Sequence, residues 1–333
     1  MSTLFNEFIL DAQDNLERLS DKISCFIGSK ILLTGAAGFL GSHFCHFFSC
    51  LNDELNENNK IKVYALDNFI RGKPLWIDSF LKRDDFEIID TDIIKTKTYP
   101  SVDYVIHAAS VASPIFYRKK PIETMDANVV GLRNLLDHVR NSPCKSFLYF
   151  STSEIYGDPD VLNIPTKEDY RGYVSSIGPR ASYDESKRYG ETLCVNFFKQ
   201  FDVPVKIVRP FNNYGPGMSL NDGRVVSDFF QNILKNQNLE LFSDGKSTRT
   251  FCYVADAINA YLLVLLSKYD GHVFNVGNPK PEISIEDLAK KIIEITNTNL
   301  VIKKIKSTDI EYLTDNPKRR CPDINKISKM LGF

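Results

Sequence analysis

Tyr183 and Lys187 stand four residues apart in "SYDESKRYGE", and this spacing puts both side chains on one face of a helix. A phenol has a pKa of about 10, and an adjacent ammonium group favours its phenolate form. A tyrosine with a lowered pKa can remove the proton of an alcohol while a hydride leaves the same carbon. We therefore predict that Tyr183 and Lys187 catalyse an alcohol oxidation and also contact the cofactor that accepts the hydride.

A second polar group, "STSE" at 151–154, directly follows the apolar run "SFLYF" at 146–150. Such a run predicts a buried strand, and open α/β sheets bind ligands at the carboxyl ends of their strands. We predict that the hydroxyl of Thr152 bonds to the same oxygen that Tyr183 deprotonates. Ser153 and Glu154 follow at the same strand end and are candidates for deciding what happens after the oxidation.

The motif "TGAAGFLGSHF" at 34–44 holds three glycines with the spacing G-x-x-G-x-x-G, between a predicted strand and a predicted helix. Glycine allows a tight turn and a close approach of the backbone to pyrophosphate, and the free N–H groups of a helix start attract phosphate. Asp67 ends the next predicted strand, where a carboxylate can accept hydrogen bonds from the adenosine ribose and would repel a 2′-phosphate. NAD is therefore predicted rather than NADP, with Arg71 as the opposing feature. Besides Tyr183 and Lys187, the predicted cofactor contacts are Gly35, Gly38, Phe39, Leu40, Gly41, Asp67, Asn68, Asp92, Ile93 and Ala108.

The elements that must position these residues alternate along the chain from Lys30 onward. Continuous apolar runs predict strands covered on both faces, and alternating strands and helices predict a parallel, doubly wound sheet. The predicted strands are 30–35, 62–67, 86–90, 103–109, 146–151, 205–210 and 272–277. The predicted helices are 4–26, 39–51, 120–141, 182–200, 224–236, 255–268, 284–296 and 323–331.

The fold class is therefore α/β, a Rossmann-type sheet with a smaller C-terminal α/β subdomain that binds the substrate. Residues 29–210 and about 252–278 are predicted to form the NAD-binding domain. Residues 211–251 and 279–333 are predicted to form the substrate-binding subdomain, and residues 1–28 an added helical extension.

Composition gives further expectations. The formal net charge of −1 offers no reason to expect nucleic acid or a membrane surface as a partner. Without a visible signal peptide or a transmembrane-length apolar segment, and with cysteines scattered as in a reducing compartment, we expect a cytoplasmic protein. His43 and His46 have no nearby carboxylate in the sequence, so no metal is predicted.

Taken together, these features resemble the extended short-chain dehydrogenase/reductase family that acts on nucleotide sugars, and the resemblance covers residues 30–325. Within that family, the chain is most similar to the UDP-glucuronate decarboxylases (UDP-xylose synthases). Besides "STSEIYGDP", the stretches that carry the resemblance are "ASPIFYRKKPIET", "GPRASYDESKRYGET", "RPFNNYGPGM", "DGRVVSDFF", "GKSTRTFCYVAD" and "DNPKRRCPDI".

The resemblance implies an NAD-dependent enzyme that oxidises the 4-hydroxyl of UDP-glucuronate, releases carbon dioxide from the resulting β-keto acid and returns the hydride to give UDP-xylose. Ser153 and Glu154 correspond to the pair that the decarboxylases carry, where 4,6-dehydratases typically have Asp-Glu. Arg249 corresponds to an arginine near the sugar carboxylate, which a guanidinium suits. The substrate-binding residues that it implies are Tyr117, Arg180, Asn212, Arg224, Val225, Arg249, Tyr253 and Arg320.

The resemblance also implies a homodimer that packs through residues 120–141 and 182–200. The apolar residues of these segments could equally belong to the core; they include Leu132, Leu135, Leu193 and Phe197.

Two alternatives stay open. The decarboxylases usually have "YGPR" where this chain has "YGPG" ending at Gly217, so a 4-epimerase or a 4,6-dehydratase could share this set of residues. A non-catalytic NAD-binding scaffold or redox sensor is the alternative from another class. The complete set of Thr152, Tyr183 and Lys187 argues against it, because a sensor needs only the glycine loop.

Overall fold

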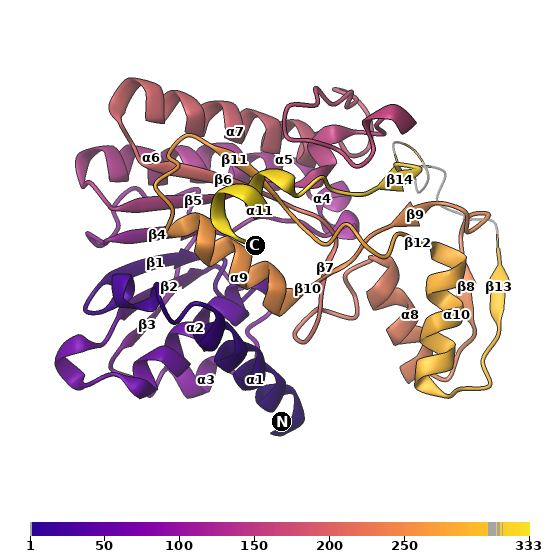
Figure 1. The fold of residues 1–333 in the computed structure, drawn as a ribbon, viewed down its shortest axis with the longest axis horizontal. Helices are drawn as coiled ribbons and strands as arrows, with labels where there is room; N and C mark the ends of the chain where they lie inside the picture. Colours follow the sequence, from indigo (N-terminus) through magenta and orange to yellow (C-terminus); the bar gives the residue numbers. More distant parts are fainter. Residues whose placement is uncertain (1, 306–310, 312–313, 315) are drawn as a thin grey trace.

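The core of the protein is a seven-stranded sheet in which every neighbouring pair of strands is parallel. The computed structural model describes residues 2–305, 311, 314 and 316–333. The strand order is β11-β6-β5-β4-β1-β2-β3 (Figure 1), so the chain reverses direction across the sheet between β1 and β4, where such folds bind dinucleotides. The strands are β1 Lys30–Thr34, β2 Lys62–Asp67, β3 Phe86–Asp90, β4 Tyr104–His107, β5 Ser146–Phe150, β6 Val205–Pro210 and β11 Val273–Val276.

The central strands bury side chains on both faces, as their apolar runs predict. In β1, Ile31 and Leu33 belong to one hydrophobic cluster and Leu32 belongs to the other, on the opposite face. The edge strand β3 differs from the prediction of full burial, because Glu87 is exposed. An edge strand has a neighbour on only one side, and a charged residue there suits contact with water.

Helices cover both faces of this sheet (Figure 1). One cluster joins it to α2 and α9, and the other joins it to α6 and α7. The single helix predicted over 120–141 is instead three segments, since a π-helical turn at Ala127–Gly131 separates two α-helices. The helices around the sheet are α2 Phe39–Glu54, α3 Ile77–Phe80, α4 Pro114–Lys119, α5 Pro121–Asp126, α6 Leu132–Asn141, α7 Ala181–Phe201, α9 Val254–Leu265 and α11 Asn325–Leu331.

A smaller group of elements stands beside the sheet, at the right of Figure 1. Here α8 and α10 pack on a two-stranded parallel pair, β8 and β13, around a separate hydrophobic cluster that includes Phe229 and Leu241. Three further short strands, β12, β9 and β14, connect this group to the site described below. The elements of this group are α8 Val225–Leu234, β8 Leu239–Leu241, β9 Thr248–Arg249, β12 Ile283–Ser284, α10 Ile285–Thr296, β13 Ile302–Lys304 and β14 Arg319–Arg320. A separate parallel pair, β7 Asn213–Tyr214 and β10 Cys252–Tyr253, packs Cys252 into the hydrophobic cluster of the main sheet.

The N-terminal helix, α1 (Ser2–Arg18), packs on the body of the protein against α2 and α9. It is shorter than the predicted 4–26, because the chain turns after Arg18 and forms a separate short helix at Ile23–Phe26. The Asn15 amide donates to the carbonyl oxygen of Ala255 at 3.1 Å, which ties α1 to α9.

No helix in the described part of the chain is both long and apolar enough to cross a lipid bilayer. Within the same described residues, no group of three histidine, cysteine, aspartate or glutamate side chains could hold a metal ion. His43 does have a carboxylate neighbour that the sequence spacing did not indicate, because α1 brings Asp11 to 3.8 Å from its ring.

Three buried histidines should resist protonation in the folded protein. Burial lowers the pKa of His43 and of His46 to about 4 and that of His107 to about 3, against 6.5 for an exposed ring. These rings therefore bind protons more readily in the unfolded chain. The stability that they contribute is complete above about pH 6.5, and it falls as the pH drops by about 1.4 kcal/mol per pH unit for each ring. Three buried carboxyl groups oppose this loss, because burial raises the pKa of Asp11 and of Asp228 to about 6 and that of Asp184 to about 7, so the folded protein binds their protons first.

The His107 ring, whose Nδ1 lies 2.8 Å from the Thr34 hydroxyl, should remain neutral at about pH 5 in a nuclear magnetic resonance titration of the folded protein. A His107 ring that titrates near its ordinary pKa would contradict the prediction.

Candidate active site

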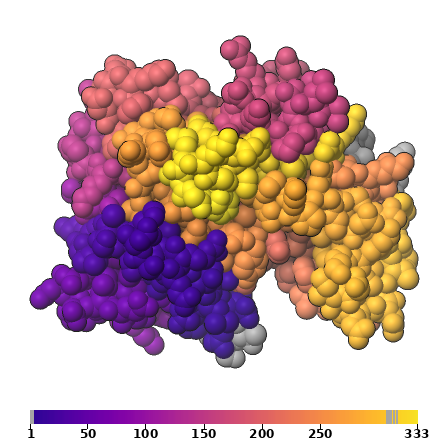
Figure 2. All heavy atoms as spheres, viewed as in Figure 1, coloured from indigo at the N-terminus to yellow at the C-terminus, as the bar shows by residue number. Residues whose placement is uncertain are grey.

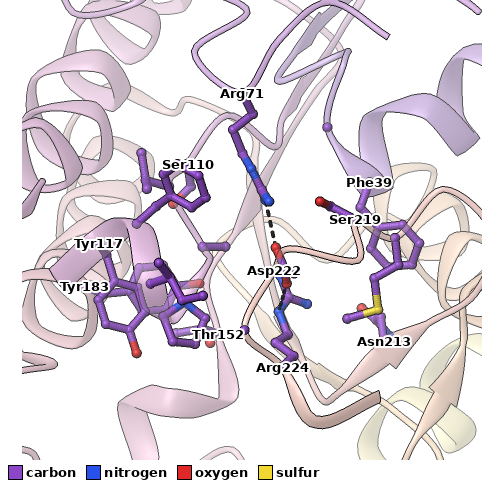
Figure 3. A pocket seen from close by; sticks show the side chains of 18 of the residues that line it. Phe39, Arg71, Ser110, Tyr117, Thr152, Tyr183, Asn213, Ser219, Asp222 and Arg224 are labelled. Carbon is purple, nitrogen blue, oxygen red and sulfur yellow. Dashed lines mark hydrogen bonds and ion pairs between the residues drawn. The ribbon is translucent and has the colours of Figure 1, made fainter. Parts of the chain in front are cut away.

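The carboxyl ends of the sheet strands and the smaller group of elements enclose a cavity of about 1070 Å³. The glycine loop and Asp67 line one side, and Thr152, Glu154 and Tyr183 line the centre. Figure 3 shows Tyr183, Thr152 and Tyr117 together on one wall, opposite Phe39 and Ser219. The structure thus brings the predicted cofactor residues and the predicted catalytic residues into one space.

Two glycines of the loop are required by close backbone contacts. Gly35 has φ of +72°, and a Cβ there would lie 2.7 Å from the nitrogen of Ala109. A Cβ on Gly41 would lie 2.1 Å from the carbonyl oxygen of Gly35. Neither position can take a side chain without movement of the backbone, and the loop leads directly into the 16-residue helix α2, whose start favours a phosphate.

Asp67 connects the glycine loop to the end of β2. One of its carboxylate oxygens accepts from the N–H of Ala37 at 2.9 Å and the other from the N–H of Phe69 at 2.8 Å. Burial raises the pKa of this carboxyl group, and these backbone donors oppose the rise. A carboxylate oxygen has lone pairs beyond these bonds, so the arrangement fits a dinucleotide whose ribose hydroxyls reach Asp67.

Replacing Gly41 by Ala should abolish cofactor binding. The new methyl group would overlap the Gly35 carbonyl oxygen and push α2 away from the loop that must approach the pyrophosphate. We expect NAD affinity to fall by about 100-fold or more, measured by calorimetry on the apoprotein. Gly332→Ala is the control, because nothing lies within 4 Å of its Cβ position. Retained NAD affinity in Gly41→Ala would show that the loop does not hold the cofactor.

The predicted catalytic set is assembled at the end of β5. Lys187 is almost fully buried, and its Nζ donates to the carbonyl oxygen of Phe150 at 2.7 Å. The Tyr183 ring stacks on Tyr117 with centroids 5.1 Å apart and planes 9° apart. Thr152 lies beside Tyr183 (Figure 3), and a side-chain hydrogen bond from Thr152 favours the Tyr183 phenolate.

The expected lowering of the Tyr183 pKa is not found in the protein alone. Burial is the largest influence and raises the pKa of Tyr183 to about 12, although Thr152 opposes this rise. Lys187 lies 5.9 Å from the centre of the phenol ring, and burial lowers the pKa of this lysine to about 7. Because a lysine with a pKa of about 7 is readily deprotonated, Lys187 stabilises the Tyr183 phenolate less than the helix spacing predicts.

Glu154 lies at the centre of a group of arginines. Its Oε2 accepts from Arg180 and, at 3.0 Å, from Arg320. Burial acts to raise the pKa of Glu154, but Arg180, Arg320, Arg249 and Arg224 together outweigh it and hold the pKa well below its usual range. The carboxylate is therefore charged, and the arginines around it leave an excess of positive charge that favours an anionic ligand.

Arg249 is held by the protein itself. Its two terminal nitrogens donate to the Asn316 side chain at 3.0 Å and to the carbonyl oxygens of Thr248, Pro317 and Lys318. The fork of this guanidinium is therefore engaged, and a two-point contact with a sugar carboxylate requires it to exchange these partners. Its predicted role at the carboxylate stays a prediction.

An ion-pair bridge that the sequence did not reveal crosses the cavity. The buried carboxylate of Asp222 contacts Arg71 at 2.7 Å and Arg224 at 2.5 Å, as Figure 3 shows. Arg71 also lies over the ring of Phe116, 4.8 Å from its centroid. Arg71 follows Asp67 in the chain, yet this pairing directs it to the substrate side of the cavity, so it does not oppose the preference for NAD. The only signal for Asp222 was its place in the "DGRVV" stretch.

Most of the predicted site residues line this cavity, and two do not. Tyr253 donates to Asp11 of α1 at 3.3 Å, and the buried Arg320 bonds to Glu154 and to the carbonyl oxygen of Ser153 at 2.8 Å. Their contact with the substrate stays a prediction: neither side chain lines the cavity itself, and Arg320 reaches it only through its bond to Glu154. The predicted residues that line it are Gly35, Gly38, Phe39, Leu40, Gly41, Asp67, Asn68, Asp92, Ile93, Ala108, Tyr117, Thr152, Ser153, Glu154, Arg180, Tyr183, Lys187, Asn212, Arg224, Val225 and Arg249.

A parallel sheet with a glycine-rich dinucleotide loop and a Thr-Tyr-Lys set defines a class of NAD-dependent enzymes, and comparison with known proteins gives the same class. Residues 31–277 match the NAD dependent epimerase/dehydratase family, and the chain belongs to that family. NAD is the cofactor of the family, and the residues above fit it.

Individual relatives with high similarity give a more specific comparison. The chain is 38% identical over 309 residues to UDP-glucuronic acid decarboxylase 3 of Arabidopsis thaliana, covering 93% of this chain and 85% of that protein. It is 38% identical over 304 residues to UDP-glucuronic acid decarboxylase 1 of Xenopus tropicalis, covering 91% of this chain and 68% of that one. Among solved structures, UDP-glucuronic acid 4-epimerase from Bacillus cereus, in complex with UDP-glucuronic acid and NAD, aligns with a TM-score of 0.76 and 29% identity, over 91% and 93% of the two chains.

Proposed function

We propose that the protein is an NAD-dependent decarboxylase that converts UDP-glucuronate to UDP-xylose. The observation that carries the proposal is the placement of Tyr183 and Thr152 beside a charged Glu154 that arginines surround, in one cavity. Relatives that share about two fifths of the residues over nearly the whole chain bear the name UDP-glucuronic acid decarboxylase, which supports the same substrate.

In this proposal Tyr183 reacts as its phenolate, which takes the proton of the sugar 4-hydroxyl and so becomes a phenol, and the Thr152 hydroxyl bonds to the same oxygen. Loss of the carboxylate leaves negative charge on the new 4-keto oxygen, which these two groups then stabilise as donors. Arg180 and Arg224, which line the cavity, attract the anionic substrate. Glu154 and Ser153 position the sugar and the water that protonates carbon 5.

The cofactor would be held by the glycine loop and Asp67 on one side and by Lys187 and Tyr183 on the other. When bound, NAD accepts a hydride from carbon 4 of the sugar and returns it within the same cycle. The reaction is therefore neutral in redox terms, and the protein needs no second substrate.

Incubation with UDP-glucuronate tests the proposal. We expect release of carbon dioxide, formation of a UDP-pentose seen by mass spectrometry, and no net NADH. A product with the mass of the substrate would identify a 4-epimerase, as in the Bacillus cereus protein of similar fold, and would overturn decarboxylation. A 4-keto-6-deoxy product from a neutral nucleotide sugar would identify a dehydratase. No turnover of any nucleotide sugar would favour a scaffold or sensor.

The proposal includes a cytoplasmic homodimer. Of the apolar residues considered for a contact between subunits, Leu132, Leu135 and Phe197 are buried in the core. Ile122 and Met125 of α5 are instead 64% and 42% exposed, and paired apolar patches of this kind suit a symmetric interface.

The double substitution Ile122→Glu and Met125→Glu should convert the proposed dimer to a monomer, which sedimentation analysis measures. Leu162→Glu is the matched control, because Leu162 is 94% exposed outside these helices and should leave the dimer intact. A wild-type protein that sediments as a monomer would contradict this part of the proposal.

A further inference from the structure

The loop 215–222 lies between α1, α2 and the cavity. Gly217, Met218, Ser219, Asn221 and Asp222 of this loop all line the cavity, as does Phe39, the first residue of α2. We infer that α1 positions this loop, and through it the substrate side of the cavity, by means of Phe8.

The contact between Phe8 and Gly217 is direct. Phe8 is only 2% exposed, and a Cβ built on Gly217 would lie 2.7 Å from the end of its ring and 3.5 Å from the Ser42 hydroxyl. Gly217 also has φ of +82°, which L side chains rarely adopt. The loop therefore touches α1 with bare backbone, and the phenyl ring occupies the space where any side chain at this position would begin.

The histidines of α2 complete this contact. Phe8 stacks on His46 with centroids 4.3 Å apart and meets His43 edge-on at 4.6 Å. The Nε2 of His43 lies 2.9 Å from the carbonyl oxygen of Pro216, so the ring that Phe8 packs against also bonds to the loop. A shift of Phe8 is thus transmitted to the loop by packing and by a hydrogen bond.

Helix α1 is anchored strongly enough to act as a fixed support. Arg18 forms an ion pair with Asp256 of α9 at 2.8 Å, and Asn15 bonds to Ala255 of the same helix. Figure 2 shows α1 lying on the face of the large body next to α9. Helix α1 precedes residue 31, where the family match begins, and none of the described residues that line the cavity belongs to α1. Phe8 is therefore a positioning residue, and it acts through the loop.

Phe8→Leu tests the inference, with Phe26→Leu as the matched control. Phe26 is equally buried but packs on Phe47, Phe48 and Tyr104, away from the loop. Both variants should lose stability. Only Phe8→Leu should raise the KM for UDP-glucuronate, by about threefold to tenfold with kcat within about twofold, and speed amide hydrogen exchange in residues 215–222.

A second pair of variants tests the same contact by changing a glycine of the loop rather than Phe8. Gly217→Ala should give the same change in KM, and Gly28→Ala should not, because it has a similar φ of +67° but nothing within 4 Å of its Cβ position. In the double variant Phe8→Leu with Gly217→Ala, the shorter side chain leaves room for the new methyl group. The two effects on KM should therefore combine to less than their product.

The inference is overturned if Phe8→Leu and Phe26→Leu have the same KM and the same exchange in the loop. The kinetic part rests on the proposed function, whereas hydrogen exchange does not. If the wild-type protein turns over no nucleotide sugar, the proposed function fails, and exchange in the loop of Phe8→Leu still decides whether α1 positions it.

Discussion

Tyr183→Phe should reduce kcat for UDP-glucuronate by about 10²-fold to 10⁴-fold, the usual range for the loss of a general acid–base group. The substitution removes only the phenol oxygen that exchanges a proton with the sugar. The ring would still stack on Tyr117 at 5.1 Å, and the glycine loop and Asp67 are unchanged. We therefore expect NAD to stay bound and the melting temperature to change little, so the loss would belong to the chemical step.

Tyr189→Phe is the matched control for this experiment. Tyr189 is on the same helix but 51% exposed, so removal of its hydroxyl should leave kcat unchanged. The pH profile of the wild-type enzyme gives a second readout, because burial raises the pKa of Tyr183 to about 12 in the protein alone. A Tyr183→Phe enzyme with unchanged turnover would exclude this residue as the base.

Glu154→Gln should lower kcat/KM by about 100-fold, a typical loss for a positioned charged group of an active site. The glutamine keeps the size of the side chain and removes the charge that pairs with Arg180 and Arg320. Because Arg320 is buried, its charge would lose its only ion-pair partner among the described residues. Such a loss is strongly destabilising, so the melting temperature should also fall.

The control must separate chemistry from stability. Glu185→Gln removes a carboxylate from the same region of α7 whose ion pair with Arg188 is partly exposed, and it should leave both activity and melting temperature nearly unchanged. NAD affinity of Glu154→Gln should also be preserved, because Glu154 is not among the residues that are predicted to contact the cofactor. If Glu154→Gln retains full kcat/KM, Glu154 only supports the fold around Arg320.

Part of the site follows from local sequence because its geometry is local. The contacts that require Gly38 and Gly41 are with the backbone of Gly35 and Ala36, at most six residues away, although Gly35 itself meets Ala109 after β4. The spacing of Tyr183 and Lys187 puts them on one helix face in any α-helix. The order of apolar runs likewise predicts the parallel sheet, since strands buried on both faces must be apolar throughout.

Other features depend on which partners meet in space. Arg320 is 166 positions from Glu154 in the chain, and only the fold brings the two into an ion pair. The pKa of Tyr183 depends on how deeply the fold buries it, which helix spacing does not report. Arg71 could have been assigned to the cofactor, and only the tertiary structure places it on Asp222.

The sequence by itself determined the sheet, the dinucleotide loop and the presence of a tyrosine-lysine pair, because backbone geometry and burial pattern are readable over a few residues. The tertiary structure alone decided the partners of the arginines, the sign of the shift in the Tyr183 pKa and the contact of Phe8 with Gly217. These features depend on close packing and electrostatics between segments that are far apart in the chain. Where a side chain has several possible partners, the sequence does not show which of them it contacts in the folded protein.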